Sequence, residues 1–127
     1  MGYAARMRFQ PGELAQLAET EEIEIETARP GAPAHRTIIW IVVDGDDAFI
    51  RSVNGATARW YREAVANPEV TIHVEGRALP CRAVPATDAH SIRRTNDVLA
   101  RKYAGFDGTA PMLEPDVFDT TLRLTPR

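Results

Sequence analysis

Apolar and polar residues alternate strictly in two segments of the chain. In "EIEIE", Glu22 to Glu26, the isoleucines fall on one side and the glutamates on the other. In "EVTIHVE", Val70, Ile72 and Val74 share a face in the same way. Because successive side chains of a strand point to opposite faces of a sheet, the pattern predicts two strands that each bury one face.

A third segment, "RTIIWIVVD" from Arg36 to Asp44, carries apolar residues at both its odd-numbered and its even-numbered positions. One face would carry Ile39, Ile41 and Val43, and the other Ile38, Trp40 and Val42. We therefore expect a strand that is buried on both sides. Asp44 and Gly45 then begin a hairpin turn, after which "AFIRSV" returns antiparallel.

Helical spacing marks two short segments and one long one. Pro11 opens a first helix in which Leu14, Leu17 and Ala18 share a face. A second runs from about Thr57 to Ala66, with Thr57 in the N-cap region and Asn67-Pro68 as its end. The longest is "TDAHSIRRTNDVLARKYAG", which Thr87 or Asp88 caps and Gly105 ends.

The remaining apolar segments complete a mainly β pattern of the α+β class. Gly76 and Arg77 turn the chain into "ALPCRAVPA", and in "FDTTLRLTP" the residues Phe118, Leu122 and Leu124 share a face. About six strands and two or three helices, joined mostly by short antiparallel connections, predict a small closed or nearly closed barrel. At 127 residues we expect a single domain that spans residues 1–127.

Composition narrows the functional classes. Hydrophobic residues make up 44% and charged residues 26%, which are ordinary globular values, and the net charge of -3 argues against a non-specific nucleic-acid binder. Cys81 is the single cysteine, so no internal disulfide forms. The N-terminal "MGYAARMRFQPGELAQ" lacks the apolar core of a signal peptide, and no segment is apolar over a bilayer's width. We expect a soluble, cytoplasmic protein with no membrane or nucleic-acid partner.

The segment from Arg51 to Arg62 gathers cationic and aromatic residues where a strand should lead into a helix. Backbone amides and the macrodipole at a helix start favour anions. Gly55 would let the backbone approach a ligand, and Ser52, Asn54 and Thr57 offer hydrogen-bond donors. Arg51, Arg59 and Arg62 could then clamp a phosphate, a group that suits the planar guanidinium.

A structural explanation of the same residues stays open. Trp60 and Tyr61 differ by about 100° on a helix, so at most one of them faces the core fully. Trp60 would pack on the barrel, while Arg59 and Arg62 would form surface ion pairs with Glu63 and Glu69.

These segments carry a family resemblance. The chain over "RTIIWIVVDGDDAFIRSVNGATARWYREAVANPEVTIHVEGRALPCRAV" resembles the FMN-binding split-barrel superfamily, which includes pyridoxamine 5′-phosphate oxidase-like and deazaflavin (F420)-dependent nitroreductase proteins. The segments "RS..G...RWYR", "ARKYAG" and "TTLRLTP" are similar to a mainly bacterial family of unknown function within it. The resemblance implies a six-stranded antiparallel split β-barrel with two or three flanking helices.

The resemblance also implies a cofactor site and a homodimer. The flavin phosphate and ring edge would lie at the strand ends and the loop before the helix, at Arg36, Arg51, Ser52, Asn54, Gly55, Thr57, Arg59, Trp60 and Tyr61. The cofactor would be F420 or FMN at the subunit seam. A dimer seam would explain why the segment that Arg36 opens is apolar on both faces.

Two functions follow as hypotheses. The first is an F420- or FMN-dependent oxidoreductase that acts on a small organic acceptor; the redox chemistry belongs to the cofactor, so the sequence assigns no catalytic residue. The second is a non-catalytic split barrel that carries another planar anion, haem among them, or a relic without a cofactor.

The other candidate residues have simpler explanations. His35, His73 and His90 lack metal-ligand spacing, so we predict no metal site. Lys102, the only lysine, suits a helix C-terminus, with a substrate-side role for Lys102 and Tyr103 as the alternative.

Overall fold

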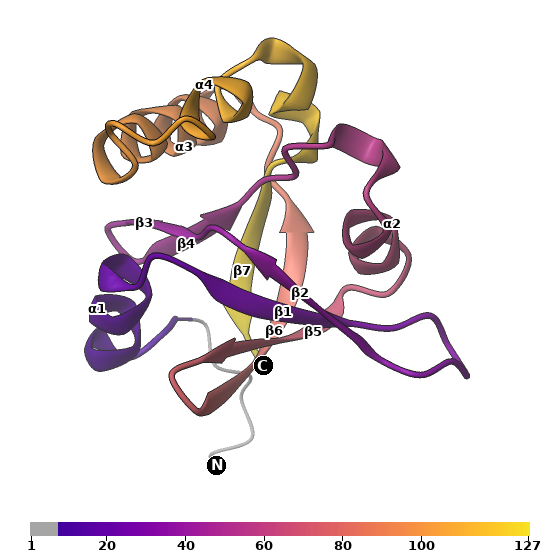
Figure 1. The fold of residues 1–127 in the computed structure, drawn as a ribbon. Helices are drawn as coiled ribbons and strands as arrows, with labels where there is room; N and C mark the ends of the chain where they lie inside the picture. The colour runs from indigo at the N-terminus through magenta and orange to yellow at the C-terminus, as the bar shows by residue number, and fades with distance from the viewer. Residues whose placement is uncertain (1–7) are drawn as a thin grey trace.

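The computed structural model describes residues 8–127 as a curled antiparallel sheet of seven strands surrounded by helices (Figure 1). The strands lie in the order β2-β1-β5-β6-β7-β4-β3. Their bounds are Ile23–Thr27 (β1), His35–Ile39 (β2), Val42–Asp44 (β3), Asp47–Ile50 (β4), Glu69–Val74 (β5), Arg77–Pro85 (β6) and Leu122–Pro126 (β7). The prediction that no signal peptide is present falls partly on residues 1–7, which lie outside the described residues.

The sheet has one strand more than the sequence pattern predicted. The segment expected to be one strand is interrupted at Trp40 and Ile41, which separate β2 from β3. These two strands stand at opposite ends of the sheet order. One short chain segment can supply both edges only if the sheet curls back toward itself, and the result is a half-barrel.

The prediction that this segment is buried on both faces holds for its second half and is wrong for its first. Val42 is 1% exposed in the apolar cluster under the longest helix, and Val43 packs on the barrel core. In β2, however, Ile38 is 61% exposed and Arg36 lies in solvent. The physical reason is that β2 is an edge strand whose one face covers the barrel interior, while nothing in the described chain covers the other.

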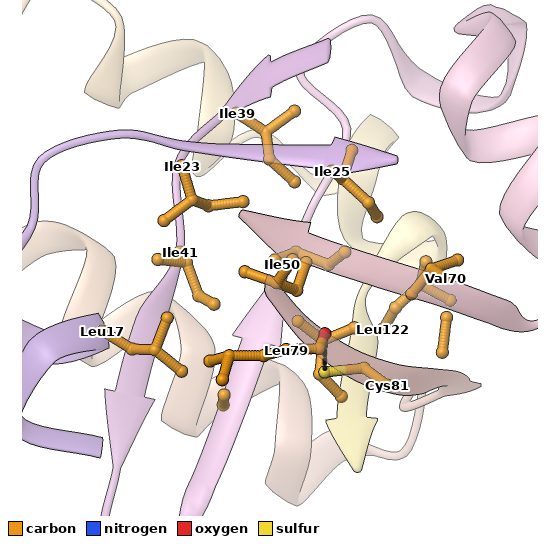
Figure 2. Packing of buried hydrophobic residues seen from close by; sticks show 14 of the residues in the cluster. Leu17, Ile23, Ile25, Ile39, Ile41, Ile50, Val70, Leu79, Cys81 and Leu122 are labelled. Atoms are coloured by element: carbon orange, nitrogen blue, oxygen red, sulfur yellow. Dashed lines mark hydrogen bonds between the residues drawn. The ribbon is translucent and has the colours of Figure 1, made fainter. Parts of the chain in front are cut away.

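Apolar side chains from most strands meet inside the half-barrel. Figure 2 shows Ile23, Ile25, Ile39, Ile41 and Ile50 pointing into this core. The predicted inward residues of β1 and β5 are all buried, and so are Cys81, Leu122 and Leu124. Burial of each large aliphatic side chain contributes about 1.5–3 kcal/mol, so this alternation of buried positions fixes the register of the sheet.

A second apolar cluster lies between the sheet and its longest helix. It contains Val42 and Phe49 of the sheet together with Val98, Leu99 and Tyr103. The helix is α3 (Ala89–Lys102), and Figure 1 shows it with α4 (Thr109–Met112) on the same side of the sheet. The predicted Asp88 cap is confirmed, because its carboxylate accepts a hydrogen bond from the Ser91 amide at 3.0 Å.

The two shorter predicted helices form with small differences. In α1 (Pro11–Glu19) Leu17 is fully buried, but Ala18 is exposed. Helix α2 spans Arg59–Ala66, and Ala58 rather than Thr57 is its N-cap residue. Thr57 belongs to the preceding 3-10 turn η1 (Gly55–Thr57), where its hydroxyl donates to the Asn54 carbonyl at 2.8 Å and is not available to the helix.

The C-terminal strand is shorter than predicted. Phe118, expected on a face with Leu122 and Leu124, lies instead in the 3-10 helix η2 (Pro115–Thr120). Among residues 8–127, the search for a helix long and apolar enough to cross a bilayer finds none.

Candidate functional site

A cavity of about 270 Å³, which we call cavity 1, lies where the break after β2, the turn after β4 and the start of α2 meet the α4 segment. Its lining is mostly apolar, with a few polar groups. It consists of Glu22, Thr37, Ile38, Ile39, Trp40, Arg51, Ser52, Val53, Asn54, Trp60, Gly108 and Met112. Mostly apolar cavities with a few placed polar groups are typical of small-molecule sites.

Arg51 is the central polar residue of cavity 1. It follows β4 directly and is only 2% exposed. Its Nε donates to Thr121 Oγ1 at 2.9 Å, and its Nη1 donates to Asn96 Oδ1 at 2.6 Å and to the Met112 carbonyl at 2.9 Å. Its Nη2 is buried and has no hydrogen-bond partner in the described chain. The guanidinium is therefore held firmly on two of its three nitrogens.

Arg51 carries its charge without a counter-ion among the described residues, since its three partners are neutral. Burial lowers the pKa of Arg51 to about 10, so the side chain is still a cation at neutral pH. The Phe118 ring, 4.9 Å from the guanidinium carbon, offers some cation–π stabilisation. A buried unpaired charge costs several kcal/mol, so an anionic or strongly accepting ligand group beside Nη2 would offset a real penalty.

Thr37 Oγ1 is the other buried side-chain polar atom that lacks a partner within the described chain. Thr37 also lines cavity 1. Buried polar groups are nearly always hydrogen-bonded, and here both exceptions belong to residues of one cavity. Both groups therefore have hydrogen-bonding capacity that the described chain does not use.

The turn after Arg51 is organised by its own hydrogen bonds. The Ser52 amide donates to Thr120 Oγ1 at 3.0 Å, and the Ser52 hydroxyl donates to the Gly55 carbonyl at 2.8 Å. Gly55 has φ of 67°, and a Cβ there would meet no atom within 4 Å. Gly55 is therefore needed for its left-handed backbone, and the predicted close approach of a ligand to this turn stays a prediction. Asn54 is exposed at the rim of the cavity.

The two aromatic residues of α2 divide as the helical geometry predicted. Trp60 is 6% exposed, packs into the core and lines cavity 1. Tyr61 is partly buried, and its hydroxyl lies 3.4 Å from the Asp119 carbonyl. The two rings meet edge to face at 6.1 Å.

The other predicted cofactor residues do not line cavity 1. Arg36 lies on the surface, where it pairs with Glu24 at 3.6 Å and Glu26 at 3.8 Å. Arg59 lines a separate cavity of about 460 Å³, which we call cavity 2. The structural alternative is confirmed for Trp60, whereas neither Arg59 nor Arg62 forms a close ion pair in residues 8–127. The charge of Arg59 does reach Glu63, whose pKa it helps to lower.

Sequence reasoning missed the residues that hold and face Arg51. Asn96, Thr121 and Met112 come from segments 45 to 70 residues away in the chain, and no local pattern links them to Arg51. Trp40 forms one wall of cavity 1, and it stacks on Tyr103 with ring centroids 3.8 Å apart and an interplanar angle of 3°. Its position at the break between two strands could have been found only by recognising that break.

Lys102 and Tyr103 line neither cavity. The Lys102 ammonium donates to the carbonyls of Leu17 at 3.1 Å and Ile41 at 2.6 Å, and burial lowers its pKa to about 8. The Tyr103 hydroxyl donates to the Glu21 carbonyl at 2.6 Å, and burial raises its pKa to about 12. Both residues hydrogen-bond to the Ile41 carbonyl at the interruption between β2 and β3, and the Tyr103 ring stacks on Trp40. Within residues 8–127, no cluster of three or more His, Cys, Asp or Glu side chains could hold a metal.

The curled antiparallel half-barrel with flanking helices is the fold of the split-barrel class that the sequence resembles. Three solved structures share it. A protein named "Putative Pyridoxamine 5'-phosphate oxidase" from Listeria innocua is 16% identical, with a TM-score of 0.66 and 91% of each chain covered. An "F420 Reductase" is 18% identical, with a TM-score of 0.57 and coverage of 94% of this chain and 96% of that one. HutZ, the haem storage protein of Vibrio cholerae, is 17% identical, with a TM-score of 0.60 and coverage of 95% of this chain and 92% of that one. At these identities the likeness concerns the fold alone.

The chain belongs to the family described as "Uncharacterized protein conserved in bacteria (DUF2255)", which it matches over residues 13–124. No curated protein matches the sequence. The predicted bacterial family is thereby confirmed, and the predicted split-barrel fold is shared with the three solved structures.

Proposed function

We propose that the chain binds a flavin-type cofactor, F420 or FMN, in cavity 1 and uses it as an oxidoreductase on a small organic acceptor. One observation carries the proposal: Arg51 is a buried cation whose neighbours are neutral and whose Nη2 has no partner. A planar, electron-rich ligand with an anionic or carbonyl oxygen would supply the hydrogen-bond acceptor that Nη2 lacks.

The lining of cavity 1 supports a ligand that is flat and largely apolar. Trp40, Trp60 and Met112 provide broad apolar walls, and Thr37 provides a hydroxyl. Proteins named as an F420 reductase and a pyridoxamine 5′-phosphate oxidase share the fold, which makes flavin-type ligands the first to test. HutZ shares the fold equally, so the choice between flavin and haem depends on the lining of cavity 1. HutZ suggests haem as another ligand, and haem iron is commonly held by a histidine imidazole. Among the described residues, no histidine lines cavity 1.

The role of the protein in the reaction is to hold charge and exclude water. A bound flavin-type group supplies hydride transfer. Arg51 would fix its acceptor oxygen and stabilise negative charge there, since the guanidinium stays protonated at neutral pH. The apolar walls would keep water from the reacting face. No side chain is required as an acid or a base.

The same proposal includes a homodimer. Cavity 1, at about 270 Å³, lies below the roughly 300 Å³ at which drug-sized ligand pockets begin, so it would enclose only part of the cofactor. At its rim Ile38 is 61% and Val53 46% exposed. A second copy placed over these apolar side chains would cover them and the rest of the cofactor.

Titration of the purified protein with FMN, with F420 and with haem tests the proposal. We expect FMN or F420 to bind saturably, with a changed absorbance spectrum and a raised melting temperature, because a ligand that binds only the folded state stabilises it. Reoxidation of the bound, reduced cofactor by a quinone or nitroaromatic acceptor would then distinguish an oxidoreductase from a carrier. Binding of haem alone, or of none of the three, would contradict the proposal.

A further inference from the structure

Cavity 2 lies between α2 and the β1–β2 hairpin. Its lining consists of Arg29, His35, Arg59, Arg62, Glu63 and Ala66. Arg59 and Arg62 are three residues apart on α2 and so share a face. Arg29 reaches the cavity from the hairpin loop, which Figure 1 shows beside α2.

The charge around cavity 2 is unbalanced. Three guanidinium groups line it, and Glu63 is the single carboxylate among them. The guanidinium groups of Arg29, Arg59 and Arg62 donate no hydrogen bond and form no close ion pair within residues 8–127, although the charge of Arg59 acts on Glu63. Other arginines of the fold do have acidic partners, as Arg82 of β6 has Glu69 and Arg94 of α3 has Asp44.

Glu63 is already engaged in holding the cavity together. It is 5% exposed, its Oε1 accepts the Thr27 hydroxyl at 2.8 Å, and His35 Nδ1 lies 3.4 Å away. Burial acts to raise its pKa, but the hydrogen bonds of Thr27 and His35 and the charges of His35 and Arg59 outweigh burial, so the pKa of Glu63 is lowered. Asn67 Nδ2 donates to the Ala28 carbonyl at 3.2 Å and ties the same helix to the same hairpin. The frame that presents the arginines is therefore fixed on both sides.

We propose that cavity 2 is a second binding site, specific for a phosphate-type oxyanion that Arg29, Arg59 and Arg62 bind together. Convergent guanidinium groups match the geometry and charge of phosphate oxygens. The cavity, at about 460 Å³, has room for more than a single phosphate.

Cavity 2 is separate from cavity 1, because the two share no lining residue. They lie close, however: His35 lines one and Thr37 the other, two residues apart on β2, which is about 7 Å along a strand. The phosphate could thus belong to a free phosphorylated metabolite or to the far end of a ligand whose ring occupies cavity 1. Both sources share the same chemistry at the arginines.

The test is calorimetric titration of the full chain with pyrophosphate, FMN and riboflavin at low and high salt. We compare the wild type with Arg59→Ala, Arg62→Ala and the double variant. Arg93→Ala and Arg101→Ala are matched controls, because these arginines of α3 are exposed and line neither cavity. We expect saturable, salt-sensitive pyrophosphate binding that weakens about threefold or more in each single variant and over about tenfold in the double variant.

The ligands separate the two sources. If the double variant weakens pyrophosphate and leaves FMN unchanged, the site takes a free phosphate; if it weakens FMN but not riboflavin, the phosphate is that of the ligand in cavity 1. Binding of pyrophosphate without any binding of FMN, F420 or riboflavin would support cavity 2 and count against the proposed cofactor of cavity 1. The inference is overturned if the wild type shows neither saturable pyrophosphate binding nor a preference for FMN over riboflavin, or if Arg93→Ala and Arg101→Ala reduce binding as much as the cavity variants.

Discussion

Replacing Arg51 with glutamine separates the role of this residue in binding from its role in folding. The substitution removes hydrogen bonds to Thr121, Asn96 and the Met112 carbonyl, each of about 0.5–1.5 kcal/mol, of which the glutamine amide can restore a part. It also removes a buried charge that lacks a counter-ion, which is a gain of stability. Because the two effects oppose each other, we expect the free energy of unfolding to change by no more than about 2 kcal/mol.

Cofactor binding should change far more than stability. A charge-assisted hydrogen bond from Arg51 Nη2 contributes about 1.5–3 kcal/mol, so Arg51→Gln should weaken FMN or F420 binding by about ten- to a hundredfold. Fluorescence titration gives the dissociation constant, and urea unfolding of the same samples gives the stability. Arg93→Gln, on the exposed side of α3, is the matched control and should change neither.

The reasoning would be refuted by a folded Arg51→Gln variant that binds the cofactor as tightly as the wild type. If that variant fails to fold, Arg51→Lys, which keeps the charge but loses the fork of donors, provides the second comparison. Lysine should restore part of the affinity if charge matters at Nη2. Equal losses in stability and affinity for both variants would indicate a structural role alone.

Three further expectations follow from other contacts. Burial lowers the pKa of Lys102 to about 8 in the folded state, so between about pH 8 and 10 the unfolded chain binds more protons than the folded one. The free energy of unfolding, measured in urea, should therefore rise over this pH range. Lys102→Gln should flatten the rise. Thr27→Val leaves the buried Glu63 carboxylate short of a donor and should cost about 1–3 kcal/mol in thermal unfolding, whereas an unchanged melting temperature would mean that the bond at 2.8 Å contributes nothing. Ile38→Asp should turn the proposed dimer into a monomer in sedimentation experiments, while Val65→Asp, at a 51% exposed position that lines neither cavity, should not.

The sequence predicted the sheet well where one face of a strand is buried. In β1 and β5 the alternation of isoleucine and valine with polar residues decided both the strand and its inward face. In the segment from Arg36 to Asp44 the same method failed, because a run that is apolar at every position does not reveal an interruption at Trp40. The two strands on either side of Trp40 form the two edges of the sheet. Where the strand is interrupted depends on how the whole sheet curls, which no local pattern records.

The surroundings of the candidate site residues could be predicted only in part, for a similar reason. Arg51 was selected because it ends a strand before a glycine turn, and the structure places it in cavity 1. Arg59 was grouped with Arg51 because the two are close in the sequence. The turn between them, residues 52–58, directs their guanidinium groups to different cavities. Asn96 and Thr121, which hold Arg51, carry no sequence signal because their contacts depend on how α3 and η2 pack on the sheet.

The most direct measurement is a crystal structure of the protein with whichever of FMN and F420 binds it. The account predicts the flavin-type ring in cavity 1, with one of its oxygen atoms within hydrogen-bond distance of Arg51 Nη2. A ligand bound elsewhere, with Arg51 Nη2 still lacking a partner, would contradict it.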